Sequence, residues 1–208
     1  PRKAAARRKT LALQSLSLSE GVSLMELRTL GSGLRLASAV CHQLPEGFSQ
    51  AAQRQGDAVS WRFEGEITQG RPLSLTKYCV FADSRRMEAP GREALRLLKT
   101  AAEQPFSDWA ARQEKALSLM MAAAQAEITG DEALDRSLSY AMYCLLASAG
   151  RDGVGNIASK GLSGEGYEGH YFWDTEIYMF PFFLLTNPGI ARALLVSRAR
   201  MLPGAFAH

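Results

Sequence analysis

The sequence predicts an α+β protein with a strand-rich first part and a helix-rich second part. Residues 1 to about 85 alternate apolar and polar side chains with a period of two, which is typical of strands. From about Ala89 onward, apolar residues recur at the three- and four-residue spacing of helices. The segment from Ala89 to Gly91, which contains Pro90, is the best boundary between the two patterns. A chain of 208 residues, 47% hydrophobic and 22% charged, is large enough to bury a core.

Alternating runs predict the strands of the first part. Turn-forming residues such as Glu20-Gly21 separate these runs, and the polar segment from Gln50 to Asp57 is interpreted as a loop. Alternation favours an antiparallel sheet with one solvated face. Because five or six strands are few for a sandwich, we expect the end of a larger β-domain. The runs, in chain order, are Leu16 and Leu18; Leu34, Leu36 and Ser38; Val59, Trp61 and Phe63; and Leu73, Leu75 and Lys77.

Start and stop signals predict four helices in the second part. The first helix runs from Glu93 to Glu103, and the second is capped by Ser107 and reaches Ala124. The third is capped by Asp131 and ends at Gly150. The fourth begins at Asn187-Pro188 and ends at Pro203-Gly204. The last two carry apolar stripes that must be buried against further helices. We therefore expect the chain to be truncated, and Pro1 in place of Met fits this view. A complete, processed small protein is the alternative, and a signal peptide upstream of Pro1 stays open.

The net charge and the number of cysteines indicate which classes of partner and which cellular compartment to expect. The formal charge is only +3, which argues against a nucleic-acid partner. The basic run from Arg2 to Lys9 is interpreted as a solvated edge or loop, with a nucleic-acid arm as the alternative. Three scattered cysteines and three scattered histidines predict no metal site, and the odd number of cysteines favours a reducing, cytoplasmic location. No apolar run reaches the ~18 residues of a membrane helix, so no membrane partner is expected.

The segment from Gly161 to Glu176 differs from the rest of the chain. Four glycines within nine positions imply backbone conformations open only to glycine. A long ordered loop between helices is usually functional. A phosphate loop is excluded, because Lys160 precedes the glycines and no GxxxxGK[ST] pattern is present. The loop instead leads into an aromatic and acidic cluster, His170 to Glu176.

A carbohydrate site needs this kind of cluster. An indole such as Trp173 can stack on the C–H face of a pyranose, and a carboxylate such as Asp174 can accept hydrogen bonds from two adjacent hydroxyls. The alternatives are that the aromatic residues form core, that Asp174 is an N-cap, and that His170 is structural. A pair of carboxylates for glycoside chemistry, Glu165 and Glu176, is a further alternative.

The run from Gly161 to Pro181, GLSGEGYEGHYFWDTEIYMFP, closely resembles the central motif of glycoside hydrolase family 65. That family includes maltose, trehalose, kojibiose and nigerose phosphorylases and some α-glucoside hydrolases. The resemblance weakens outward but persists through Gly130-Asp131 and through Ala191 to Gly204. It implies that residues 1–88 are the C-terminal part of a β-sandwich, 89–129 a helical linker, and 130–208 the first helices of an (α/α)6 barrel.

The same resemblance implies the roles of individual residues. Trp173 and Asp174 would line the glucose subsite where the bond is cleaved. Phe172, His170 and Tyr167 would shape the same wall. The general acid, a glutamate, and the loop that holds phosphate are expected beyond His208. This chain would therefore contain no catalytic residue and be inactive alone.

The implied reaction is inverting phosphorolysis of an α-glucosyl disaccharide of the maltose type, giving β-glucose 1-phosphate and glucose. Inorganic phosphate would be the co-substrate, and no cofactor would be needed. An α-glucoside hydrolase of the same family, acting with a base and water, is one alternative. A non-catalytic sugar-binding fragment is the other. Because family members are often dimers, a homodimer is expected for the full-length protein.

Overall fold

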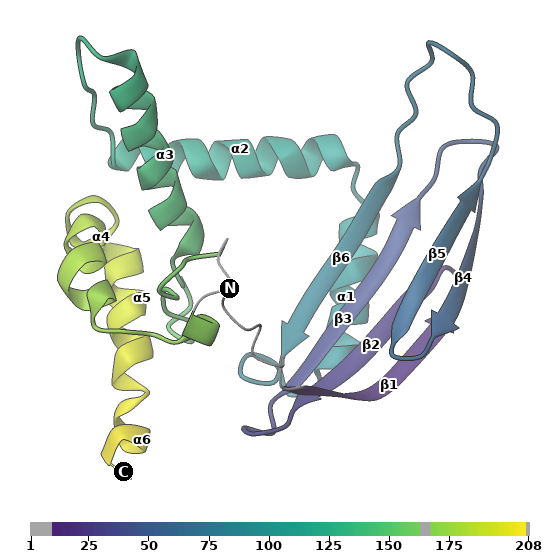
Figure 1. Cartoon of the computed structure of the whole chain (residues 1–208), viewed down its shortest axis with the longest axis horizontal. Helices are drawn as coiled ribbons and strands as arrows, with labels where there is room; N and C mark the ends of the chain where they lie inside the picture. The colour runs from purple at the N-terminus through teal and green to yellow at the C-terminus, as the bar shows by residue number, and fades with distance from the viewer. Residues whose placement is uncertain (1–9, 163–166, 207–208) are drawn as a thin grey trace, which may run out of the picture. The chain divides into compact units, whose positions relative to one another are not determined.

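The computed structural model describes residues 10–162 and 167–206, and the chain divides into two compact units, one ending at Trp109 and one beginning at Ala110 (Figure 1). An α+β composition is confirmed. The elements are β1 (Leu11–Ser19), β2 (Val22–Thr29), β3 (Arg35–Gln43), β4 (Ser49–Gln55), β5 (Ala58–Glu64), β6 (Thr76–Asp83), α1 (Pro90–Ala102), α2 (Phe106–Ala123), α3 (Glu132–Ser148), η1 (Tyr167–Gly169), η2 (Thr175–Met179), α4 (Phe180–Thr186), α5 (Pro188–Ala199) and α6 (Leu202–Phe206).

The main sheet of the first unit is antiparallel, with strand order β1-β2-β3-β6. Ser19 pairs with Val22, so Glu20 and Gly21 form a two-residue turn. Both have positive φ, 49° and 77°, as in the turns whose twist matches that of the strands they join. The predicted turn at Glu20-Gly21 is thus confirmed.

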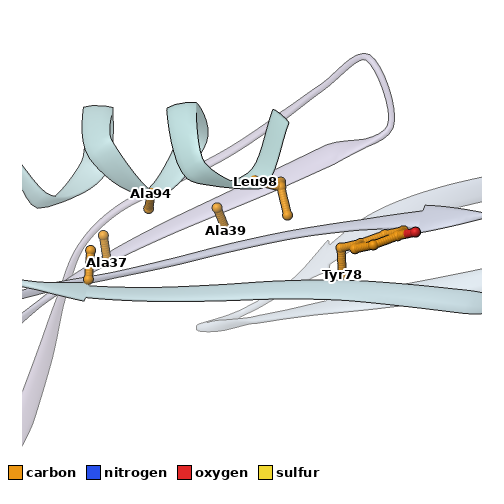
Figure 2. Packing of buried hydrophobic residues seen from close by; sticks show 6 residues of the cluster. Ala37, Ala39, Tyr78, Ala94 and Leu98 are labelled. Carbon is orange, nitrogen blue, oxygen red and sulfur yellow. The ribbon is translucent and has the colours of Figure 1, made fainter. Parts of the chain in front are cut away.

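Helix α1 packs on one face of this sheet and encloses the core of the first unit (Figure 2). Ala37 and Ala39 of β3 are small enough for the helix to approach closely, and Ala94 and Leu98 of α1 face them. The Leu98 side chain is 2% exposed, and its burial contributes about 1.5–3 kcal/mol. The change of period at Ala89 to Gly91 therefore marks the start of a helix that belongs with the sheet. The division at residues 88 and 129 stays a prediction.

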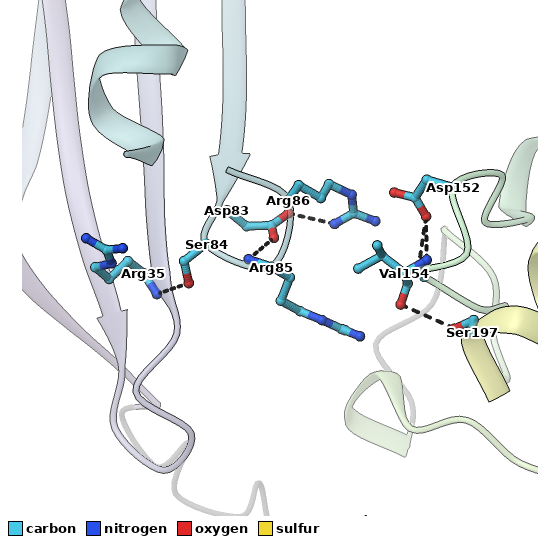
Figure 3. A network of polar contacts seen from close by, with 9 residues as sticks. Arg35, Asp83, Ser84, Arg85, Arg86, Asp152, Val154 and Ser197 are labelled. Atoms are coloured by element: carbon cyan, nitrogen blue, oxygen red, sulfur yellow. Dashed lines mark hydrogen bonds and ion pairs between the residues drawn. The ribbon is translucent and has the colours of Figure 1, made fainter. Parts of the chain in front are cut away.

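The turn between β6 and α1 is fixed by one carboxylate (Figure 3). Asp83 accepts a hydrogen bond from the backbone N–H of Arg85 at 2.8 Å and one from the guanidinium of Arg86 at 2.6 Å. The backbone N–H of Arg35 donates to the Ser84 hydroxyl at 3.0 Å, which ties the turn to β3. The chain can therefore reverse from the strand into the helix with its polar groups satisfied.

Two strand predictions were wrong. The segment from Gln50 to Asp57, expected as a loop, contains all but the first residue of strand β4, which pairs with β5. Every side chain of β4 is exposed, so no apolar alternation marks it. Leu73 and Leu75, expected in a strand, lie before β6 and are about half exposed. The last residue of β3, Gln43, pairs with Thr76, so no strand remains for Leu73 and Leu75 to pair with.

The sheet face opposite α1 carries His42, which packs against the β4–β5 hairpin. Its ring contacts the rings of Trp61 and Phe63 edge-on, with centroids 4.8 and 4.9 Å away. Within the described part of the chain, the buried Nδ1 of His42 has no hydrogen-bond partner. Burial, and then the positive charge of Lys77 on the neighbouring strand, lower the pKa of His42 below its usual 6.5.

We expect this histidine to make the first unit less stable in mild acid. Because the folded-state pKa of His42 lies below the unfolded value, the neutral ring stabilises the fold above pH 6.5, and this contribution is lost as the pH falls through the lowered pKa. Urea midpoints between pH 7.5 and 5 measure the effect. His42→Gln, which does not titrate, should flatten the pH dependence. An unchanged slope in that variant would contradict the assignment.

The helix signals were only partly right. Asp131 caps α3 as predicted, since its carboxylate accepts from the N–H groups of Ala133 and Leu134, both at 3.0 Å. Ser107 is not the cap of α2, because the helix already begins at Phe106. Asn187 occupies the cap position of α5, but its side chain makes no capping bond.

The ends of two helices also differ from expectation. Gly150 does not adopt the left-handed conformation of a usual C′ glycine. It is needed instead for a close approach, since a Cβ there would lie 2.2 Å from the carbonyl oxygen of Gly155. Pro203 and Gly204 do not close α5, which ends at Ala199, and lie within the short helix α6.

Candidate functional site

The second unit has a separate core that supports the motif segment. Its largest fully buried side chains, each less than 2% exposed, come from α3, the following loop, α4 and α5. Thr175, the first residue of η2, is 3% exposed, and its hydroxyl lies 3.4 Å from the carbonyl oxygen of Ile157. The residues from Phe172 to Met179 are therefore attached to a packed scaffold. The fully buried side chains are Leu146, Ile157, Phe183 and Leu194.

The backbone of the first part of the motif takes left-handed conformations at several positions. Gly161 and Gly169 have φ values of 59° and 75°, which confirms the prediction for these two glycines. Gly164, Glu165 and Gly166 lie outside the described residues. Tyr167 has a φ of 54°, which is uncommon for a residue with a large side chain and is a form of strain found mainly at functional sites.

Three of the five predicted site residues line one cavity of about 390 Å³ in the second unit. Tyr167 and Phe172 meet edge-on, with ring centroids 5.5 Å apart, and form an aromatic side of the cavity. Asp174 provides a carboxylate. The volume lies within the range of small-molecule sites. The other lining residues are Ser159, Thr175, Tyr178 and Met179.

The other two predicted residues do not line this cavity. The Trp173 side chain is 69% exposed to solvent. His170 is also exposed, and its Nδ1 lies 2.6 Å from the carbonyl oxygen of Tyr167. Because a carbonyl only accepts, Nδ1 must carry a proton and donate. His170 thus stabilises the η1 turn. Trp173 is exposed and is not a lining residue, and its stacking role stays a prediction.

Asp174 has no hydrogen-bond or ion-pair partner within the described part of the chain. It stands at the cap position of η2, but its side chain makes no capping bond, so the interpretation of Asp174 as a capping residue was wrong. Its carboxylate is exposed and available to a ligand. The turn that follows is a π-helix, a feature frequent at functional sites.

Glu176 forms an ion pair with Arg198 and does not line the cavity. Its carboxylate accepts two hydrogen bonds from Arg198 of α5, at 2.9 Å from Nε and 2.7 Å from Nη2. These hydrogen bonds, reinforced by the positive charge of Arg198, hold the pKa of Glu176 below its usual range. A carboxylate that is ionised and paired is not available as an acid, so the alternative in which Glu176 forms a catalytic pair with Glu165 finds no support from Glu176.

Sequence reasoning missed the four other lining residues and Arg198. Tyr178 follows Asp174 by four positions, a helical spacing that could have drawn attention to it. Ser159 and Met179 reach the cavity only through the fold of the loop after α3. Arg198 follows Glu176 by 22 positions, and no local pattern links two residues so far apart.

The described part of the chain contains no candidate metal site and no candidate membrane span. Within residues 10–162 and 167–206, no group of three or more His, Cys, Asp or Glu side chains is placed to hold a metal ion. No helix in the same ranges combines the length and the apolar character needed to cross a bilayer.

Comparison with known families gives two matches. The N-terminal domain of glycosyl hydrolase family 65 matches residues 2–119. The central catalytic domain of the same family matches residues 139–208. The first match spans most of the first unit and the start of the second, and the second match includes every residue that lines the cavity.

Individual proteins are similar over much of this chain. The α,α-trehalose phosphorylase of Geobacillus stearothermophilus is 36% identical over 97% of the chain and 26% of its own length. The kojibiose phosphorylase of Escherichia coli K12 is 39% identical over 67% of the chain and 19% of its own length. A solved structure titled as a putative kojibiose phosphorylase from the human microbiome has a TM-score of 0.77 at 23% identity, covering 91% of this chain and 25% of its own. This likeness shows a shared fold, and the chain spans about a quarter or less of these relatives.

Proposed function

The chain belongs to glycosyl hydrolase family 65, and we propose that the whole protein phosphorolyses an α-glucosyl disaccharide with inversion, giving β-glucose 1-phosphate and glucose. The observation that carries the proposal is the Asp174 carboxylate, which lines an aromatic-sided cavity and has no partner among the residues that the structure describes. The names of the relatives, trehalose and kojibiose phosphorylase, favour phosphorolysis over hydrolysis.

Asp174 would bind the glucose unit through its rim of hydroxyls. A carboxylate can accept from two adjacent hydroxyls, and such charge-assisted bonds are roughly twice as strong as neutral ones. A sugar whose hydroxyls point elsewhere would leave the carboxylate unpaired, at a cost of about 1–3 kcal/mol or more. Tyr167 and Phe172 would contact the apolar C–H groups, and Trp173 would close over the ring from outside the cavity.

Bond cleavage needs two groups in addition to this wall. A glutamic acid would protonate the glycosidic oxygen, while phosphate attacks the anomeric carbon from the opposite face. The C–O bond to the leaving glucose breaks as the bond to phosphate forms, so the α-linkage yields a β-phosphate. We propose that both groups come from parts of the whole protein other than this chain.

Assays of the whole protein with phosphate and maltose, trehalose, kojibiose or nigerose test the proposal. Phosphate-dependent release of glucose 1-phosphate from at least one disaccharide is the expected result. Maltose was the first expectation, and the named relatives make trehalose and kojibiose the better substrates to try first. Glucose release that does not depend on phosphate would identify a hydrolase instead. No cleavage of any of the four would overturn the proposal.

A further inference from the structure

The segment that carries Trp173 and Asp174 is held on both sides by a single guanidinium. Nη2 of Arg198 donates to the carbonyl oxygen of Phe172 at 2.8 Å. The same group makes the two hydrogen bonds to the Glu176 carboxylate described above. Phe172 and Glu176 each lie two positions from Asp174, one before it and one after. We infer that Arg198 is a positioning residue that fixes the orientation of Asp174 toward the sugar.

Arg198 can fix this segment because its own backbone is fixed. Its helix, α5, buries Ile190, Ala191 and Leu194 in the core of the second unit. Ser197, which is 2% exposed, donates through its hydroxyl to the carbonyl oxygen of Val154 at 3.2 Å (Figure 3). Arg200 donates to the carbonyl oxygen of Gly153 at 2.9 Å. The end of α5 is thus joined to the loop after α3 on either side of Arg198.

The ion pair between Arg198 and Glu176 is strong enough to hold the segment around Asp174 in place. The side chains of Arg198 and Glu176 are 30% and 29% exposed, so solvent screens them less than a surface pair. The bidentate geometry restricts orientation as well as distance, which a lysine at this position could not reproduce. The ion pair raises the pKa of Arg198 and lowers that of Glu176, so both stay charged throughout the range in which an enzyme works.

The turn around Asp174 has ordinary backbone hydrogen bonds to the Trp173 carbonyl, from Glu176 N–H at 3.0 Å and Ile177 N–H at 3.1 Å, but only a long one to the Phe172 carbonyl, from Thr175 N–H at 3.4 Å. The Asp174 side chain adds no capping bond to this turn. The Phe172 carbonyl therefore relies on Arg198 for its shorter contact. Without the guanidinium, the backbone from Phe172 to Glu176 could rotate and carry Asp174 away from the cavity. A displacement of about 1 Å at a reacting group can cost about a hundredfold in rate.

This role rests on the proposed function, and kinetics of the whole protein can separate the two. Arg198→Ala should raise KM for the cleaved disaccharide by about ten- to a hundredfold and leave KM for phosphate unchanged. Arg198→Lys, which keeps a charge and one donor, should restore part of the loss. Loss of folded protein alone would lower kcat and move neither KM. Arg192→Ala, an exposed arginine on the same helix with no partner among the described residues, is the matched control and should behave as wild type.

Three results would overturn the inference. The first is a disaccharide KM that does not change in Arg198→Ala. The second is an equal change, in that variant, of the KM for the disaccharide and the KM for phosphate. The third is a rise of the disaccharide KM in Arg192→Ala as large as that in Arg198→Ala. If Arg198→Ala does not fold, Glu176→Gln is the second variant, because it leaves the hydrogen bond between Arg198 and the Phe172 carbonyl in place. It should raise the disaccharide KM by less than the roughly ten- to hundredfold rise expected for Arg198→Ala, and no rise would overturn the inference. A wild-type protein that cleaves no disaccharide contradicts the proposed function itself. An active wild type that loses activity in Asp174→Asn but not in the Arg198 variants contradicts only the positioning role.

Discussion

Replacing Asp174 with asparagine is expected to lower kcat/KM of the whole protein for its disaccharide by about a hundredfold or more. The asparagine keeps the shape of the side chain but loses the charge that strengthens hydrogen bonds from two sugar hydroxyls. Each hydrogen bond to a charged group contributes about 1.5–3 kcal/mol, and 1.4 kcal/mol corresponds to tenfold. Steady-state kinetics with saturating phosphate measures the change.

A carboxylate outside the cavity provides the control for this variant. Glu132, whose side chain is 83% exposed and paired only with Arg136 one turn later, can be replaced by glutamine without touching the site. We expect wild-type kinetics from Glu132→Gln and an intact unfolding transition from both variants. Asp174→Asn with wild-type kcat/KM would show that this carboxylate does not bind the reacting sugar.

Replacing Phe183 with alanine is expected to destabilise the second unit by about 3–5 kcal/mol. The side chain is fully buried, with 0% exposure, and meets the ring of Phe182 edge-on at 5.1 Å. Its removal leaves a cavity among the residues of the core that supports the site, which include Leu146, Ile157 and Leu194. A shift of the urea midpoint, followed by circular dichroism, measures the loss.

The same helix supplies the matched control for the core variant. Leu185 lies two positions from Phe183 in α4, and its side chain is 83% exposed. Leu185→Ala removes a similar apolar group but creates no cavity, so a change within about 0.5 kcal/mol is expected. Equal midpoint shifts for the two variants would mean that the core of the second unit is not where the structure places it.

The sequence predicts elements well where side chains alternate between a core and solvent. Asp131 and Glu20-Gly21 each depend on local chemistry, and each is found as expected, whereas only Met142 and Leu146 of α3 are buried. Strand β4 was missed because it has no buried face, and its pairing with β5 cannot be seen in its own composition. The alternation of Leu73 and Leu75 was misleading because a strand also needs a partner, and β3 ends too early to provide one.

The site residues also differ in whether neighbouring residues in the sequence are enough to predict their place. The motif could identify Tyr167, Phe172 and Asp174 because its residues are adjacent and unusual together, and the fold brings these three to one cavity. The pairing of Glu176 with Arg198 depends on how α5 packs, and the exposure of Trp173 likewise depends on the fold around it. How α5 packs is a property of the tertiary structure, and it cannot be predicted from the spacing of residues within the motif.

The central claim is that Asp174 binds the glucose ring beside the aromatic pair Tyr167 and Phe172. A crystal structure of the whole protein with glucose bound tests it most directly. The account predicts both oxygens of Asp174 within hydrogen-bond distance of adjacent hydroxyls, with Arg198 still bound to Glu176. Glucose bound elsewhere, with the Asp174 carboxylate facing solvent, would contradict the account.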